Sequence, residues 1–361
     1  MVTSVPLAPV SQDRGRHQAP VVVSDCASRE DCDEYVASRP DASAYHAPVW
    51  LDIIHRAFGH ETCYLTAESE GAICGVAPLV FFSSRVFGRF TVSMPFVNYG
   101  GVLADHDVAA RALLARAIEE TRRTGGRHLE LRHCDDQMFR DLAPRRHKVA
   151  MELALAPTAD EQWKVLDRKL RNQVRKAEKS DLVAEQGGAE LLPAFYEVFA
   201  RNMRDLGTPV YGVRFFREVL SALPDCSRVL CVRHKGQPVA ASIVHWRGPR
   251  VEVPWASALR EFNPLCPNVL LYWSMIQLAI GRGCATFDFG RSTPDEGTYQ
   301  FKKQWGAVPR QLVWEYWTAP GQSMPDMSPA NPRFDLAVRV WQRLPVPVAT
   351  ALGPHIVRNI P

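Results

Sequence analysis

The feature that most constrains the fold is a pattern that occurs twice along the chain. In each half, three segments of alternating apolar and polar residues precede a helical segment, which stops at glycine and is followed by another strand. Two equivalent pairs, Tyr99 with Trp255 and Gly125 with Gly281, are each 156 positions apart. The turn glycines Gly71 and Gly236 are 165 apart, and the extra residues fall in a loop, where insertions cost little. We interpret the pattern as an internal duplication. The alternative is that any α/β chain repeats such helix–glycine–strand junctions.

The periodicity predicts the individual elements of both halves. In the first half we expect helices at 30–38, 48–58 and 109–124, and strands at 62–68, 72–82, 90–97, 128–132 and 148–155. In the second half we expect strands at 228–234, 238–246, 250–258 and 285–289, helices within 189–222, and helices at 269–280 and 299–305. The expected fold class is therefore α/β (α+β), with two tandem domains that each contain a mixed sheet flanked by helices.

The domain boundaries follow from this pattern and from composition. A chain of 361 residues is long enough for two domains. We expect a disordered leader at 1–20, an N-terminal domain at 21–157 and a C-terminal domain at 158–320. The remainder, 321–361, is expected to be a linker followed by an apolar, arginine-containing helix and tail.

Charge and cysteine content limit the function classes. The net charge of +4 favours anionic partners such as phosphates, without being strong enough to indicate nucleic-acid binding by itself. The nine cysteines are scattered and form no Cys-x-x-Cys pair, so we expect reduced thiols and no metal site. The first twenty residues contain no continuous apolar run, and no stretch of eighteen apolar residues occurs anywhere. The sequence thus predicts a cytoplasmic protein.

One segment of the second half combines polar residues in a way that is typical of a binding site. The strand at 285–289 ends at Gly290 and delivers Asp288 to the edge of a sheet, with Arg291 and Ser292 in the following loop. In the next short helix, at 299–305, the spacing turns Lys302 back towards this strand end. The alternative is a structural salt bridge between Asp288 and one of the two cations.

A basic helix is expected between the two halves. Residues 163–179 carry one apolar stripe and one cationic stripe, and the cationic stripe includes Arg171 and Arg175. Such a face is usually solvated, and phosphate binding is the sharper hypothesis. Further along, the loop at 207–212 places the aromatic Tyr211 at its tip.

The C-terminal segment allows two interpretations. Residues 333–344 are apolar with interspersed arginines, and a proline-broken apolar tail follows. We favour a helix docked on the body of the protein. The alternative is an interfacial helix on an anionic membrane, with Trp341 at the level of the lipid headgroups.

Several of these segments together resemble the FemAB family, which belongs to the GNAT-like acyltransferases. The resemblance rests on the basic helix Leu170–Lys179, the strand end Asp288–Ser292 and the segment Tyr299–Lys302. More narrowly, the Phe96–Gly101 segment and the 344–354 tail are similar to FemAB-like proteins found with exosortase (PEP-CTERM) and exopolysaccharide gene clusters. The similarity extends from about residue 40 to the C-terminus.

The resemblance implies a reaction in which an amine attacks an activated carbonyl through a tetrahedral oxyanion. It implies two catalytic residues: Lys302, which would stabilise the oxyanion, and Asp288, which would orient or deprotonate the amine. It also implies a set of substrate-binding residues: Arg291, Arg171 and Arg175 for phosphates, Tyr99, Tyr211 and Trp255 for stacking, Asn98 for the acceptor, and Ser292, Tyr299 and Gln300 beside them.

The family implies an acyl donor and an acceptor without fixing either. The donor is acyl-CoA or aminoacyl-tRNA, which makes tRNA an expected partner, and the acceptor is an amine of a saccharide or peptide-like envelope or exopolysaccharide precursor. The turn at 260–268 contains no glycine of the kind that cradles the pyrophosphate of coenzyme A, and no long heptad segment for holding tRNA occurs. Two alternatives remain: an acetyl-CoA-dependent N-acetyltransferase acting on an amino sugar, and a non-catalytic precursor-binding protein. Peripheral contact with the inner face of a membrane through 333–361 is the alternative to docking of this segment on the protein body.

Overall fold

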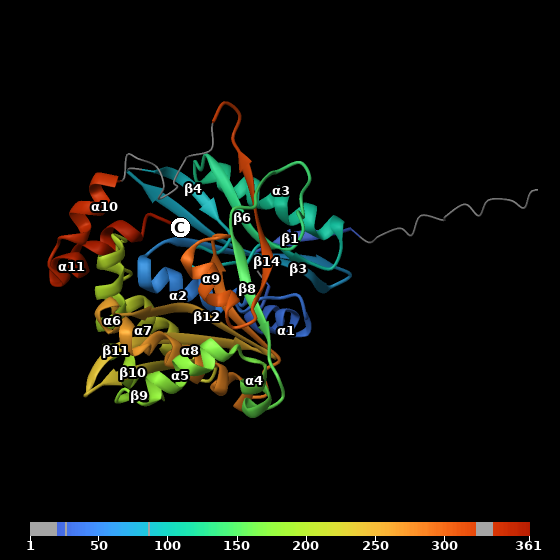
Figure 1. Cartoon of the computed structure of the whole chain (residues 1–361). Helices are drawn as coiled ribbons and strands as arrows, with labels where there is room; N and C mark the ends of the chain where they lie inside the picture. Colours follow the sequence, from blue (N-terminus) through green and yellow to red (C-terminus); the bar gives the residue numbers. More distant parts are fainter. Residues whose placement is uncertain (1–19, 26, 86, 323–334) are drawn as a thin grey trace, which may run out of the picture.

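The computed structural model describes residues 20–322, except 26 and 86, and residues 335–361 (Figure 1). The predicted disordered leader lies almost wholly outside the described residues, as does most of the predicted linker. The helices are α1 (Arg29–Ser38), α2 (Val49–Phe58), α3 (Asp107–Arg123), α4 (Ala159–Val165), α5 (Arg168–Glu178), α6 (Leu192–Leu206), α7 (Val213–Ala222), α8 (Pro267–Gly281), α9 (Gly297–Lys303), α10 (Asp335–Gln342) and α11 (Val346–Val357).

The strands form one continuous sheet. They are β1 (Val22–Ser24), β2 (Glu61–Ser69), β3 (Ala72–Ser84), β4 (Gly88–Val92), β5 (Leu103–Ala104), β6 (His128–Cys134), β7 (Ala143–Arg145), β8 (Val149–Ala154), β9 (Leu182–Gly187), β10 (Ser227–His234), β11 (Gln237–Arg247), β12 (Arg250–Ala258), β13 (Thr286–Ser292) and β14 (Val308–Thr318). Their order is β1-β2-β3-β4-β6-β14-β8-β13-β12-β11-β10-β9, with β5 beside β3 and β7 beside β14.

The strand order of the second half is the reverse of that of the first half, and each half contributes one strand that pairs with the other half. Each half contributes an antiparallel meander, a crossover helix and a parallel strand: β2 to β4, α3 and β6 in the first half, and β10 to β12, α8 and β13 in the second. The last strand of the first half, β8, pairs with β13 of the second. The last strand of the second half, β14, pairs with β6 of the first. The predicted domains 21–157 and 158–320 are therefore two segments of the chain that share one continuous sheet.

The repeated topology confirms the predicted fold class, a mixed α/β sheet flanked by helices. Both parallel pairs are short. Pairing of β4 with β6 ends at Val92 and Glu130, and pairing of β12 with β13 ends at Glu252 and Asp288. Beyond Glu252 and Asp288 the strands β12 and β13 continue without pairing with each other, whereas β4 itself ends at Val92.

Some predicted elements differ from the observed ones. The helix expected at 163–179 is two helices, because the backbone is extended at Leu166 and the side chain of Asp167 caps α5 by accepting a hydrogen bond from the Lys169 amide. The third predicted strand ends at Val92 rather than at 97. Strands β9 and β14 and helix α11 had not been predicted.

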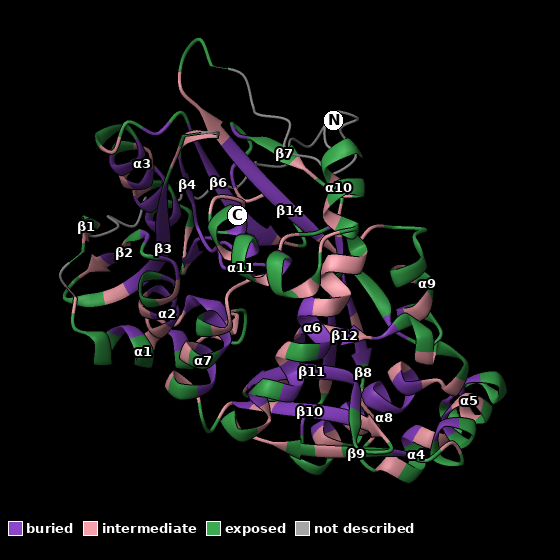
Figure 2. Ribbon diagram, turned by 90° about the vertical axis from the view of Figure 1, so that its left-hand side faces the viewer, coloured by how far each residue is buried: buried purple, intermediate pink, exposed green. Residues whose placement is uncertain are grey.

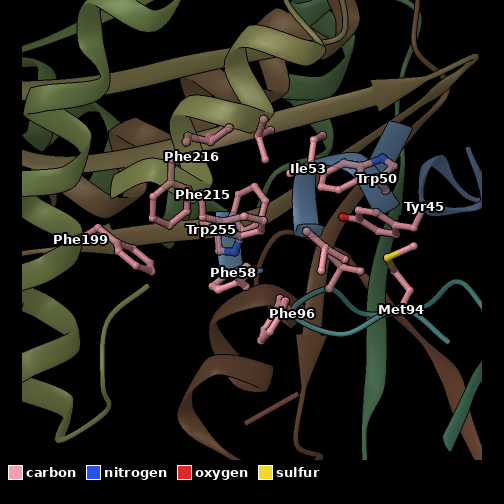
Figure 3. Close-up of a cluster of buried hydrophobic side chains, with 14 of the residues drawn as sticks. Tyr45, Trp50, Ile53, Phe58, Met94, Phe96, Phe199, Phe215, Phe216 and Trp255 are labelled. Carbon is pink, nitrogen blue, oxygen red and sulfur yellow. The ribbon is translucent and has the colours of Figure 1, made fainter. Parts of the chain in front are cut away.

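The largest hydrophobic core lies between the two halves. Helices α2, α6 and α7 pack on one face of the sheet, and their aromatic side chains meet there (Figure 3). Phe58 of the first half contacts Phe215 of the second, with ring centroids 5.0 Å apart. Burial is strongest along the central strands, whereas the outer faces of the helices are exposed (Figure 2). The core therefore joins the two halves into one unit.

The C-terminal helices dock on α6 (Figure 1). Gly207 at the end of α6 lies so close to Val338 of α10 that an added Cβ atom would meet its side chain at 2.5 Å. The Arg204 guanidinium donates a hydrogen bond to the carbonyl oxygen of Leu344.

Within the described ranges, no helix is both long and apolar enough to cross a bilayer.

Candidate functional site

A β-bulge in β13 sets the direction of two of the predicted site residues. In the pairing with β8, Asp288 faces Glu152 and Arg291 faces Ala150, so β13 uses one residue more than its partner. Gly290 provides this bulge with a backbone φ of +73°. As a result, Asp288 and Arg291 point to the same face of the sheet, although they are three positions apart.

Asp288 is fully buried and both of its carboxylate oxygens accept hydrogen bonds. The amide of Gly290 donates to Oδ1 at 2.8 Å, and the hydroxyl of Tyr99 donates to Oδ2. A guanidinium nitrogen of Arg250 lies 3.7 Å from Oδ2. Burial raises the pKa of Asp288 above its ordinary value, and the two hydrogen bonds oppose this shift. Asp288 is therefore a buried carboxyl group with increased basicity.

A second buried carboxyl group, Glu252 of β12, lies beside Asp288 where the two strands separate. Burial and the neighbouring Asp288 raise the pKa of Glu252 to about 8. The side-chain amide of Asn98 donates a hydrogen bond to Glu252 at 2.8 Å. Asn98 and Tyr99 both come from the first half, so this half closes the opening between β12 and β13. The two adjacent carboxyl groups are predicted to hold one proton between them near neutral pH.

Lys302 of α9 also reaches the end of β13, as the sequence predicted. Its ammonium group donates to the carbonyl oxygens of Gly290 at 3.0 Å and Arg291 at 2.8 Å. Burial lowers the pKa of Lys302 to about 8, and the negative charge of Asp288 opposes this shift. Two of the three N–H donors of the ammonium group are thereby used, and the side chain is buried.

A cavity of about 280 Å³ lies next to the buried carboxyl groups. Tyr99 and Arg250 line it, and both contact Asp288. Arg310 lies on the same wall and contacts Asp135 and Glu152. Asp288 itself is therefore separated from this cavity by one layer of side chains.

His46 adds an unsatisfied donor to the wall of the same cavity. Its Nδ1 atom accepts a hydrogen bond from the Ser43 amide, which assigns the proton to Nε2. The Nε2 atom is buried and has no hydrogen-bond partner. Burial lowers the pKa of His46 to about 4, with a further contribution from His133, so the ring is neutral near pH 7. The wall of the cavity thus contains a buried, neutral N–H donor without a partner.

Arg291 and Tyr211 lie on the face of the sheet that also carries Asp288. The Arg291 guanidinium lies 5.8 Å from the ring centroid of Trp314, and Arg132 lies 4.3 Å from the same ring. The ring of Tyr211 is half-buried and packs against Phe58 and other aromatic residues of the inter-half core. Tyr211 is therefore partly a core residue.

The remaining predicted residues divide between the strand end and other parts of the fold. The Ser292 hydroxyl is buried beside Arg291 without a hydrogen-bond partner. Tyr299 is half-buried and Gln300 exposed on α9. Trp255 is a core residue, 5% exposed, and packs edge-on against Phe215 and Phe216, so neither of its faces is open for stacking.

Arg171 and Arg175 lie on α5, away from the strand end. The Arg175 guanidinium lies over the ring of Trp163, which in turn contacts Trp273 of α8. In the part of the chain that the structure describes, no hydrogen bond or ion pair joins either arginine to Asp288 or Lys302. These two cations therefore do not belong to the cluster around Asp288.

Sequence reasoning missed Arg250, Glu252, Arg310 and His46. A signal was present for the first two: they are charged residues two positions apart in a strand whose neighbours are apolar, so both face the same side of the sheet. A charged pair on an otherwise apolar strand indicates a paired or functional charge. No comparable signal marks His46, because its position depends on the packing of the N-terminal segment.

Comparison with known proteins places part of the chain in a family of domains. Residues 166–303 match the family described as acetyltransferase (GNAT) domain. The sequence matches none of the curated proteins with which it was compared.

Solved structures share the fold over most of the chain. The crystal structure of FemX is 15% identical, with a TM-score of 0.62 over 82% of this chain and 97% of that one. A tandem GNAT protein from the clavulanic acid biosynthesis pathway is 13% identical, with a TM-score of 0.55 over 84% of this chain and all of that one. L-PGS from Bacillus licheniformis is 11% identical, with a TM-score of 0.55 over 87% of this chain and 97% of that one. Residues 166–303 are thus similar to a GNAT acetyltransferase domain, and a tandem GNAT protein shares the fold over most of the chain.

Proposed function

We propose that this protein transfers an acyl or aminoacyl group from an activated donor to an amine of an exopolysaccharide or cell-envelope precursor. The observation that carries the proposal is the hydrogen bond from the Tyr99 hydroxyl to the buried Asp288. Because Tyr99 also lines the cavity, it links this carboxyl group to the cavity. The name of one structural neighbour, the C-terminal domain of a putative lysylphosphatidylglycerol synthetase from Agrobacterium fabrum, supports transfer of an amino acid. The association with exosortase systems rests on the sequence resemblance.

Asp288 is the group that takes up the proton of the attacking amine. Because it is fully buried, it acts through Tyr99: the phenolic oxygen accepts a proton from the amine while the phenolic proton passes to Oδ2. Burial raises the pKa of Asp288, which makes the carboxylate a better base than an exposed aspartate. The negative charge of Glu152 also raises the pKa of Asp288 and so contributes to this basicity.

Lys302 is the group that stabilises the oxyanion. Two of its N–H bonds are held by the carbonyl oxygens of Gly290 and Arg291, and this fixes the direction of the third. In a site that excludes water, a fixed ammonium group stabilises the negative charge of the transition state by about 3 kcal/mol for a single donor. The alternative role of Lys302 is to hold the bulge of β13 in place.

The reaction balances with these residues alone. The nitrogen lone pair forms the C–N bond, and the carbonyl π electrons move to the oxygen, next to Lys302. When the tetrahedral intermediate collapses, the bond to the leaving group breaks, and the proton held by Asp288 returns through Tyr99 to the leaving thiolate or alkoxide.

The backbone N–H groups at the N-termini of the crossover helices α3 and α8 help to distinguish between the two acyl donors. In GNAT-like folds a pyrophosphate binds where free backbone N–H groups begin such a helix. Here Pro267 removes one of these donors from α8. In α3 the His106 side chain occupies the Ala109 amide, and Asp107 adds negative charge. These features favour an aminoacyl donor over acyl-CoA bound in this manner.

A second candidate function is acetyl-CoA-dependent N-acetylation of an amino sugar. It is favoured by the match of residues 166–303 to the acetyltransferase (GNAT) domain family, whose members typically use acyl-CoA. The two candidates differ in the donor, whereas Asp288, Tyr99 and Lys302 have the same roles in both.

The proposal is tested in two steps. The purified protein is incubated separately with acetyl-CoA and with charged tRNA, and release of free thiol or of uncharged tRNA identifies the donor. Surface polysaccharide is then compared by mass spectrometry between cells with the wild-type protein and cells with Lys302→Ala. We expect one substituent to be missing in the variant. A wild-type pattern of modification in cells with a folded Lys302→Ala protein would instead favour the non-catalytic precursor-binding function.

A further inference from the structure

Helices α10 and α11 pack on the protein with one side and expose apolar side chains on the other. The large side chains of Leu336 and Val340 on α10 are 73% and 54% exposed. On α11, Val348, Leu352 and Ile356 follow one another at intervals of four and are 41%, 48% and 40% exposed. This spacing places the three α11 side chains on one outward stripe. We name these five residues the C-terminal apolar face.

The same helix also has an apolar inner face. Ala349, Gly353 and Val357 of α11 are buried against the body of the protein. Gly353 lies so close to Val210 that an added Cβ atom would meet the Val210 amide nitrogen at 2.8 Å. A helix that only docks has a polar outer face. Because α11 is apolar on both sides, its outward side is suited to a second apolar surface.

The charges of α10 and α11 are mainly positive, and their one acidic residue is Asp335 at the first position of α10. Residues 336–361 include no Asp or Glu, but they include Arg339, Arg343 and Arg358. All three arginines are exposed. Among the described residues, no ion pair joins them to a carboxylate. Arginines that surround exposed Val, Leu and Ile side chains fit an anionic lipid bilayer, in which acyl chains take the apolar groups and phosphates take the cations.

The position of the face on the molecule agrees with surface attachment rather than insertion. No described helix can cross a bilayer. The face is held to both halves of the protein: the ring of His60 donates a hydrogen bond to the carbonyl oxygen of Arg358 at 2.7 Å, and Gly353 packs on the loop that carries Tyr211. A membrane bound here would therefore lie against the same end of the molecule as this loop.

We propose that the C-terminal apolar face, together with Arg339, Arg343 and Arg358, attaches the protein to the surface of an anionic membrane. The attachment is peripheral. It depends on the arrangement of α10 and α11 and not on acyl transfer, so it can be tested independently of the proposed function.

The test is co-sedimentation of the full-length protein with vesicles of two compositions. One set contains phosphatidylcholine alone and the other contains equal parts of phosphatidylcholine and phosphatidylglycerol. We expect binding to the anionic vesicles that weakens as the salt concentration rises. Failure of the wild-type protein to bind the anionic vesicles would overturn the proposal.

Two variants separate the apolar and the electrostatic contributions. The triple variant Val348→Ser, Leu352→Ser, Ile356→Ser should bind anionic vesicles about tenfold more weakly or worse. Its control is Val183→Ser with Val308→Ser, which removes two exposed valines elsewhere on the surface. The double variant Arg343→Gln, Arg358→Gln should bind more weakly by a similar factor, whereas Arg140→Gln with Arg217→Gln should not.

The alternative occupant of this face is a second copy of the chain. Sedimentation velocity without lipid detects this arrangement. A wild-type dimer that the triple variant converts to a monomer would assign the face to self-association and overturn the membrane proposal, as would wild-type lipid binding by the triple variant. Circular dichroism shows that the variants remain folded.

Discussion

The hydroxyl group of Tyr99 donates a hydrogen bond to Asp288 although the two residues are 189 positions apart in the sequence. Tyr99 follows the first meander and Asp288 lies in the parallel strand of the second half. The bond therefore places a group from one half directly on a buried carboxyl group of the other. The proposed site exists only when both halves are assembled.

Replacing Tyr99 with Phe should impair both stability and transfer. The substitution keeps the ring but leaves Oδ2 of the buried Asp288 without its hydroxyl donor, which should lower the free energy of unfolding by about 1–3 kcal/mol. Transfer should slow by about a hundredfold or more, because the path for the proton is lost. Urea unfolding and steady-state kinetics measure the two effects. Tyr272→Phe is the control, since the Tyr272 ring is also buried. Full activity of Tyr99→Phe would exclude the relay through this hydroxyl.

Lys302 should produce a pH dependence of both stability and activity near pH 8. Its pKa is about 8 in the folded protein and 10.5 in the unfolded chain, so between these values the unfolded state binds more protons. The free energy of unfolding should rise as pH increases through this window and should not change from this cause below pH 8. If the ammonium form stabilises the oxyanion, kcat should fall over the same range.

The comparison that isolates Lys302 uses its exposed neighbour. Lys302→Met should remove the alkaline rise in stability, whereas Lys303→Met should keep it, because Lys303 is exposed on α9. Unfolding by urea at several pH values between 7 and 10.5 measures the rise at about half-unit intervals. Identical pH profiles for wild type and Lys302→Met would show that burial does not shift this pKa.

Glu252 should give the opposite dependence in a lower pH range. Its pKa is raised from 4.5 to about 8, so between these values the folded protein binds more protons than the unfolded chain. The free energy of unfolding of the wild type should therefore fall as pH rises from 4.5 to 8. Glu252→Gln retains an oxygen for the Asn98 amide and removes the charge, so it should be increasingly more stable than wild type as pH rises. The exposed Glu178→Gln is the control, and a constant difference across this range would contradict the prediction.

The bulge at Gly290 should tolerate no side chain. Gly290 and Gly283 both have a φ of +73°, but an added Cβ atom at Gly290 would meet the carbonyl oxygen of Val253 at 2.9 Å, whereas nothing lies within 4 Å at Gly283. Gly283→Ala should therefore lower the free energy of unfolding by about 1 kcal/mol, from backbone strain alone. Gly290→Ala adds the clash and should lower it by about 3 kcal/mol or more. Thermal or urea unfolding of the pair measures the difference, and equal losses would mean that the sheet relaxes around residue 290.

Local patterns were sufficient to predict most of the fold. The alternation in 286–289 and the glycine after it placed Asp288 at the end of a strand, and the spacing of Phe301 and Trp305 turned Lys302 towards it. These signals depend on a few neighbouring residues, so they can be read from the sequence. The break between α4 and α5 was missed because the apolar spacing continues across Leu166 and Asp167.

The contacts between the halves could not be predicted in the same way. The sequence contains no local sign that Tyr99 and Asn98 meet Asp288 and Glu252, because their position depends on how the two halves of the sheet join. Strand β14 was missed for a related reason: it is buried in the centre of the sheet, and its mostly apolar sequence lacks the alternation of a half-exposed strand. Trp255 was expected to be accessible because an aromatic residue in a strand looks the same whether it lines a pocket or fills a core.

The exchange of β8 and β14 between the halves affects folding of the chain during its synthesis. Strand β6 is synthesised early, but the strand that covers its edge ends only at Thr318. Until the ribosome has passed this point, the backbone of β6 presents unpaired amide and carbonyl groups, which invite misassembly with other nascent chains. Translation of the last part of the chain thus joins the two halves of the sheet, and premature termination before residue 308 would leave β6 and β8 without the strand that pairs with both.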